Sequence, residues 1–117
     1  MTYDELVLKV RDVFEDADAR QVYEHIAVQV NVTGEAAGTF YIEIAERHVC
    51  VEPYDYYNHD ACVRVDTKTL CDLMERRITY ADACKDGNVW IEGNPYKIGL
   101  LGKVNVKIAK KHGQKER

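Results

Sequence analysis

The chain has 117 residues, of which 46% are hydrophobic and 31% charged, with a formal net charge of -4 at pH 7. This composition is typical of one globular domain and excludes disordered, collagen-like and disulfide-scaffold proteins. No apolar run approaches the ~20 residues that cross a bilayer, and the acidic start Met1–Glu5 is unlike a signal peptide. We expect a single domain over residues 1–112, a frayed basic tail over 113–117, and a cytoplasmic location.

The N-terminal half predicts one helix and then four strands. Thr2 with Glu5 is a capping-box pattern, and apolar residues then recur at helical spacing, which predicts a helix over residues 3–19. From Tyr23 onward the apolar residues recur at every second position, which is typical of strands with one buried face. The predicted strands cover residues 23–32, 40–45, 48–52 and 61–65. We expect these four strands to form an antiparallel meander.

The C-terminal half predicts two short helices, a fifth strand and a last helix. Asp66 and Thr79 are typical N-caps, and Gly87 suits a left-handed helix end, so two helices fill residues 67–86. A strand follows over 88–92, and the remainder, opened by a proline, predicts the last helix. This order favours an α+β fold, with a five-stranded, mainly antiparallel sheet and helices packed on one face.

No catalytic or metal-binding motif stands out. The histidines are scattered, and neither a phosphate loop nor a nucleophile motif is present. The densest polar cluster, Asp55, His59 and Asp60, has residue types that hold metals or transfer protons, but we favour a loop whose side chains cap its own backbone. We expect no catalytic residue, no metal and no cofactor. The cysteines lack CxxC spacing, and we expect reduced thiols at Cys50, Cys62, Cys71 and Cys84.

The last predicted helix has an apolar side and a basic side. Its inner stripe contains Ile98, Leu101, Val104 and Ile108. Its opposite face carries Lys103, Lys107, Lys110 and Lys111. The acidic total charge and the lack of an aromatic platform argue against nucleic acid as a partner. We expect transient contact of this basic face with an anionic membrane, although cations near a helix C-terminus also stabilise the helix dipole.

The stretch from Thr39 to Leu101, and most clearly its segment from Ala81 to Asn94, resembles the sterol-binding domain of the sterol carrier protein type 2 family. It has that family's small-residue helix, its glycine and the alternating strand that ends in a glycine. Upstream, alternating Val63 and Val65 followed by a capped helix is similar to the family's fourth strand and next helix. The sequence departs from the pattern at Arg76 and the following arginine, where a glycine is usual.

This resemblance implies an apolar tunnel between sheet and helices that holds a sterol, a fatty acyl chain or another lipid. The residues are compatible with it, because β-branched side chains on the sheet face several small ones on the helices. We therefore predict a non-catalytic lipid-binding or lipid-transfer domain. The predicted pocket lining is Ile42, Ile44, Val49, Val51, Val63, Val65, Leu70, Leu73, Met74, Ala83, Val89, Ile91, Ile98 and Leu101.

The other sheet face carries aromatic residues. Alternation places Tyr23, Tyr41 and Trp90 on the side away from the helices. Aromatic groups on an open sheet face are typical of a contact with a partner, and we predict a homodimer through this face. The alternative to a lipid carrier is a dimerisation or assembly module with a closed core and no ligand.

Overall fold

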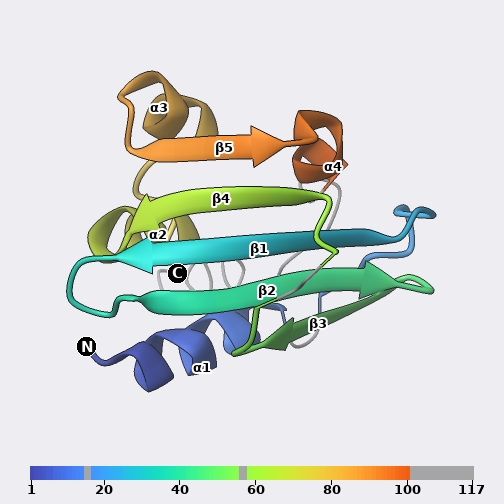
Figure 1. The fold of residues 1–117 in the computed structure, drawn as a ribbon, viewed down its shortest axis with the longest axis horizontal. Helices are drawn as coiled ribbons and strands as arrows, with labels where there is room; N and C mark the ends of the chain where they lie inside the picture. The colour runs from blue at the N-terminus through green and yellow to red at the C-terminus, as the bar shows by residue number, and fades with distance from the viewer. Residues whose placement is uncertain (15–16, 56–57, 101–117) are drawn as a thin grey trace, which may run out of the picture.

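The computed structural model describes residues 1–14, 17–55 and 58–100 (Figure 1). Within these ranges, the helices and strands follow one another in the order that the sequence predicts. They are α1 (Tyr3–Phe14), β1 (Ile26–Thr33), β2 (Gly38–Ala45), β3 (His48–Glu52), β4 (Ala61–Asp66), α2 (Thr67–Met74), α3 (Tyr80–Lys85), β5 (Val89–Gly93) and α4 (Pro95–Leu100). The predicted helix beyond residue 100, its four lysines and the basic tail lie outside the described residues.

The five strands form one sheet in the order β3-β2-β1-β4-β5. Neighbouring strands are antiparallel except β1 and β4, which are parallel. The predicted α+β fold with a mainly antiparallel sheet is therefore confirmed. The predicted four-strand meander is wrong at its last step, because β4 pairs with β1 and not with β3. Alternation identifies the buried face of a strand but does not identify its neighbour, and β1, with most residues buried, occupies the centre.

The connection from β3 to β4 must cross β2 and β1 to reach the other side of the sheet, and Asp60 fixes its far end. The Asp60 amide donates to the Ala27 carbonyl at 2.7 Å, and the Asp60 carboxylate accepts from the Ala27 amide at 2.8 Å. The Asp60 carbonyl also accepts from the Asn94 amide at 3.1 Å. Gly93, at φ +98°, packs so closely on Asp60 and Ala61 that a side chain would collide with their backbone.

Helix starts follow the predicted caps. The Thr2 hydroxyl accepts from the Glu5 amide at 3.1 Å while the Glu5 carboxylate accepts from the Thr2 amide at 2.8 Å, which completes a capping box. Asp66 caps α2 and Thr79 caps α3 through side-chain oxygens that accept backbone N–H groups at 3.1 and 3.0 Å. In α4, the Asn94 side chain accepts from the Tyr96 amide at 3.0 Å.

The first helix is shorter than predicted. α1 ends at Phe14, whereas the sequence pattern predicts a helix to residue 19. The Ala17 amide bonds to the Phe14 carbonyl at 3.1 Å, and the Asp18 carboxylate accepts from the Arg20 amide at 3.0 Å. Such side-chain bonds give the backbone an alternative to helix, so Asp18 and Arg20 stabilise a loop at this point.

The core lies between the sheet and the helices. The register places Val28 beside Ile42 and Ala61, and Val30 beside Phe40 and Val63, so alternate residues of every strand share the helix-facing side. α1 adds a buried stripe to this layer. The opposite side of the sheet carries mostly polar residues. Figure 1 shows α1 and α2 behind the same face of the sheet. A cavity for an apolar ligand, as the sequence predicts, would therefore lie on the helix side of the sheet.

Candidate functional site

An apolar cavity of about 650 Å³ lies between the sheet and the helices. Its size is within the ~300–1,000 Å³ that small-molecule sites occupy. Most of its lining side chains are aliphatic or aromatic and come from α1, β1, β2, α2 and α4. The lining consists of Val10, Val13, Phe14, Val30, Phe40, Ile42, Leu70, Leu73, Met74, Arg76, Ile78, Thr79, Tyr80, Ile98 and Gly99. Among the described residues, the arrangement provides a partly open apolar cavity that the sheet lines on one side and α1, α2 and α4 on the other.

Incomplete burial of apolar side chains accompanies this cavity. Phe14, Leu70, Leu73 and Ile78 pack against the core yet stay only partly buried. In a close-packed domain such side chains would be covered by neighbours. Within the part of the chain that the structure describes, these four side chains border the cavity instead.

The polar groups of the lining gather in one stretch, the link between α2 and α3. Arg76 and Thr79 lie in this link, and Tyr80 is the first residue of α3. The side chains of the other lining residues carry no N–H or O–H group. The Thr79 hydroxyl accepts from the Asp82 amide at 3.0 Å and keeps its own proton for donation. Burial and a hydrogen bond with the Cys84 thiol raise the pKa of the Tyr80 phenol, which therefore stays neutral at physiological pH. The cavity thus has one polar end.

Part of the predicted lining lies at this cavity. Ile42, Leu70, Leu73, Met74 and Ile98 line it, and Leu101 is outside the described residues. Eight other predicted residues lie elsewhere in the core layer or at its edge, away from the cavity walls: Ile44, Val49, Val51, Val63, Val65, Ala83, Val89 and Ile91. The pocket is shifted toward one part of the sheet and does not extend under all five strands.

The sequence-based prediction left out the contribution of the first helix. Val10, Val13 and Phe14 of α1 form one wall, and Phe40 of β2 forms part of the floor. The amphipathic spacing of α1 marked its inner residues as core. It carried no signal that this inner face and α2 line one cavity, because that depends on how two helices distant in sequence are placed on the sheet.

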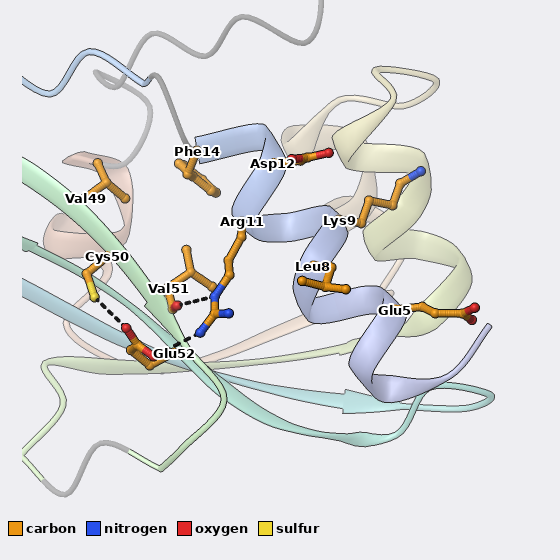
Figure 2. Close-up of a pocket in the computed structure, with 10 residues that line it drawn as sticks. All are labelled: Glu5, Leu8, Lys9, Arg11, Asp12, Phe14, Val49, Cys50, Val51 and Glu52. Carbon is orange, nitrogen blue, oxygen red and sulfur yellow. Dashed lines mark hydrogen bonds and ion pairs between the residues drawn. The ribbon is translucent and has the colours of Figure 1, made fainter.

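A second hollow of about 820 Å³ lies outside the core, between α1 and β3 (Figure 2). Val49 and Val51 line it, but charged side chains do too. The Arg11 guanidinium donates to the Val51 carbonyl at 2.9 Å and to the Glu52 carboxylate at 3.0 Å. Burial and the adjacent Glu52 raise the pKa of the Cys50 thiol, which keeps it protonated. These groups already satisfy one another, so the inner cavity is the better candidate for an apolar ligand.

The polar loop cluster has a structural explanation. The Asp60 carboxylate is engaged by the Ala27 amide, and Asp55 and His59 are exposed. Within the described residues, no group of three or more His, Cys, Asp or Glu side chains is placed to hold a metal ion. The described cysteines are free thiols. None of the described helices is long and apolar enough to span a membrane.

The three aromatic residues predicted for the open face are solvent-accessible in different degrees, and Tyr23 precedes β1, so it lies outside the sheet and not in a strand as predicted. Tyr23 is 80% exposed and Trp90 is 60% exposed, whereas Tyr41 is half-buried. The Arg47 guanidinium stands 5.5 Å from the centre of the Tyr23 ring, a cation–π distance. Trp90 pairs across the strands with Arg64. The homodimer through this face stays a prediction.

Comparison with solved structures identifies the fold. Sterol carrier protein 2 like 2 from Aedes aegypti matches with a TM-score of 0.65 at 16% identity, over 86% of this chain and 94% of that one. The solution structure of palmitated SCP2L2 from the same mosquito matches with a TM-score of 0.64 at 16% identity, over 85% and 90%. This chain therefore has the fold of sterol carrier protein 2, as the sequence resemblance predicted.

The same fold occurs inside a larger enzyme. A double mutant of the sec-alkylsulfatase Pisa1, a protein from Pseudomonas sp., matches with a TM-score of 0.67 at 17% identity, over 77% of this chain. The match spans only 14% of the sulfatase chain. No protein-family model and no curated protein matches this sequence. Because all these identities are low, the comparisons define the fold and leave the ligand to be argued from the cavity.

Proposed function

We propose that this chain is a non-catalytic lipid-binding domain that holds a single apolar chain between its sheet and its helices. The observation that carries the proposal is the cavity of about 650 Å³ with an almost wholly apolar lining. A closed-core assembly module, the alternative expectation, does not require partly buried residues such as Leu70 and Leu73 to line a cavity.

The energetics of such a ligand are favourable. Burying about 12 methylene groups at ~0.8 kcal/mol each contributes about 10 kcal/mol. Association costs ~4–15 kcal/mol, so the balance permits measurable affinity without an elaborate polar site. A chain of that length suits a cavity of this volume, and the polar link between α2 and α3 supplies an end where a head group meets water.

The comparisons support the proposal by analogy. One structural neighbour is palmitated SCP2L2 from Aedes aegypti. The sulfatase match is confined to a small part of that enzyme, so its catalysis is not proposed for this chain. Lipid transfer and contact with anionic membranes are further expectations of a carrier. They involve the lysines beyond residue 100.

The test places a larger side chain at a residue that lines the cavity, so that the side chain occupies the space of the ligand. Leu73→Trp places an indole at a lining position of α2, whereas Leu8→Trp places the same group on α1 beside the outer hollow. We expect delipidated wild type and Leu8→Trp to bind the neutral fluorophore Nile red and release it to dodecanol. Leu73→Trp, with a retained circular dichroism spectrum, should bind at least about 10-fold more weakly, equivalent to about 1.4 kcal/mol. Equal binding by all three folded proteins would contradict the inner cavity as the site.

A further inference from the structure

The residue that ends α2 is unusual for its place in the chain. Glu75 is the C-cap of α2, the Arg76 amide bonds to the Leu73 carbonyl at 3.2 Å, and the Arg77 amide bonds to the Asp72 carbonyl at 2.9 Å. This is a Schellman motif, in which the residue after the cap adopts a left-handed conformation and is usually glycine. Here that residue is Arg76, at φ +62°.

The same molecule uses glycine for the same task one helix later. α3 ends with the Gly87 amide bonded to the Cys84 carbonyl at 3.1 Å and the Asn88 amide bonded to the Ala83 carbonyl at 2.9 Å, and Gly87 has φ +77°. A left-handed conformation costs a residue with a side chain ~1–2 kcal/mol. The fold therefore carries a conformational cost at Arg76 that glycine would remove, and such outliers concentrate at functional sites.

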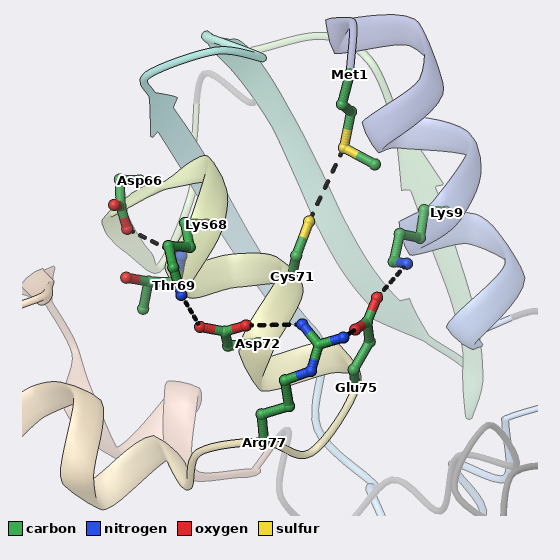
Figure 3. A network of polar contacts seen from close by, with 9 residues as sticks. All are labelled: Met1, Lys9, Asp66, Lys68, Thr69, Cys71, Asp72, Glu75 and Arg77. Carbon is green, nitrogen blue, oxygen red and sulfur yellow. Dashed lines mark hydrogen bonds and ion pairs between the residues drawn. The ribbon is translucent and has the colours of Figure 1, made fainter.

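Among the described residues, the acids closest to Arg76 in sequence are already paired with other cations. Figure 3 shows that the neighbouring acids form ion pairs with other cations. The Glu75 carboxylate lies 2.6 Å from the Lys9 ammonium nitrogen and 2.7 Å from a guanidinium nitrogen of Arg77. The Asp72 carboxylate forms ion pairs with Lys68 at 2.9 Å and with Arg77 at 3.2 Å. These partners lower the pKa of the Asp72 and Glu75 carboxyls, so both stay ionised and paired.

Arg76 forms no ion pair within the described part of the chain, although it lines the apolar cavity. Stabilisation of the helix dipole does not explain its conformation, because Arg77 already supplies a cation at the same helix end without a left-handed backbone. Arg76 is exposed to solvent where it lines the cavity, so its guanidinium matches a ligand with an apolar chain and an anionic oxygen head group, which it would bind through a forked pair of N–H donors.

We infer that Arg76 is the head-group anchor of the cavity, and that the domain selects single-chain anionic amphiphiles over neutral ones. This inference rests on the proposed lipid-binding function. The chain of the ligand occupies the space between α1, α2 and the sheet, and its charged end lies at the link between α2 and α3. The Thr79 hydroxyl, at the same end, accepts a backbone N–H and keeps its own proton, so it is an additional donor.

The experiment compares three ligands with one chain length: dodecanoate, dodecyl phosphate and dodecanol, each titrated calorimetrically into delipidated full-length protein at pH 8. We expect wild type to bind at least one of the two anions about 10-fold more tightly than dodecanol, the equivalent of ~1.4 kcal/mol. The stronger of the two anions identifies the head group as carboxylate or phosphate. Equal affinity for all three ligands overturns the inference.

The variants separate anchoring from folding. Arg76→Gln should bind the preferred anion about 10-fold more weakly and dodecanol unchanged, whereas Arg64→Gln, on the open sheet face, should match wild type. Arg76→Gly should lose the same anion preference while its unfolding temperature stays at or above that of wild type, since glycine removes the left-handed strain. A merely structural Arg76 would leave anion preference intact in these variants, and that result overturns the inference.

Failure of the proposed function gives a different result. If wild type binds neither the anions nor dodecanol, the cavity is not a lipid site and the anchor has no ligand. If wild type binds all of them and Arg76→Gln changes nothing, the lipid site stands and the anchoring role is refuted.

Discussion

Lys9 of α1 and Glu75 at the end of α2 form an ion pair of 2.6 Å between residues 66 positions apart in the chain. It joins the two helices that wall the cavity, whose inner faces contribute Val10 and Leu73 to its lining. Arg77 binds the same carboxylate at 2.7 Å from the opposite side, as Figure 3 shows. A polar clamp therefore joins two helices whose apolar sides both line the inner cavity.

This clamp predicts an acid-dependent loss of stability. The hydrogen bond from Lys9 lowers the pKa of the Glu75 carboxyl. A lowered folded-state pKa means that the contribution to stability is complete above the unfolded pKa, ~4.3, and disappears as the pH falls through the folded pKa. Because the pair is partly exposed, we expect about 0.2–1 kcal/mol from it.

The measurement is urea unfolding of wild type and Glu75→Gln at pH 7 and at the lowest pH that keeps wild type folded. The variant should be less stable at pH 7, and the difference should shrink on acidification. Lys9→Gln should give a similar profile, since it removes the other partner. A difference that is independent of pH would show that the ionised carboxylate is not the stabilising form.

Substitution by alanine should have opposite effects on stability at two glycines, Gly38 and Gly99. A side-chain carbon at Gly38 would overlap the ring of Tyr3, whose hydroxyl is bonded to the Thr39 carbonyl. Gly38→Ala should destabilise the fold by about 1–3 kcal/mol, as overpacking does. At Gly99, in α4 beside the cavity, an added carbon has no atom of the described residues within 4 Å. Gly99→Ala should stabilise by about 0.5–1 kcal/mol through helix propensity.

Thermal and urea unfolding of both alanine variants test this pair. A destabilised Gly99→Ala would mean that the position is more crowded than the structure has it. A neutral Gly38→Ala would mean that Tyr3 moves aside easily and is not a fixed contact between α1 and β2.

The open sheet face predicts self-association. Trp90 is 60% exposed beside a strand that carries few large apolar groups on this face, and burial of its ring in a twofold contact would shift its fluorescence to shorter wavelengths. We expect a concentration-dependent dimer by analytical ultracentrifugation, weakened in Trp90→Lys. Arg20→Lys, at an exposed loop position that pairs locally with Asp18, is the control and should associate as wild type does. A constant monomer mass with a water-like Trp90 emission would refute the predicted dimer.

Much of the fold follows from local signals in the sequence. The capping pairs at Thr2, Asp66 and Thr79 mark three helix starts correctly, and Gly87 marks a left-handed helix end, because each of these depends on hydrogen bonds within a few residues. The helix predicted through Asp18 is too long, since helical spacing of apolar residues continued into a loop that side-chain bonds stabilise.

The non-local features were harder to predict. Alternation in residues 61–65 locates a strand but does not reveal that Val63 pairs with Val30 of β1. For the same reason, the predicted lining included Val89 and Ile91, which face the helix layer away from the cavity, and omitted Phe14. A cavity is set by the spacing between helices, and no pattern within one segment of the chain encodes that distance.

The most direct test of the central claim is the position of a bound acyl chain. In methyl-labelled protein saturated with dodecanoate, intermolecular NOEs should connect the ligand methylenes to Val10, Leu73 and Ile98, which line the inner cavity. They should not connect the ligand to Leu8 and Val49, which line the outer hollow. NOEs confined to the outer hollow, or none at saturating ligand, would contradict the account.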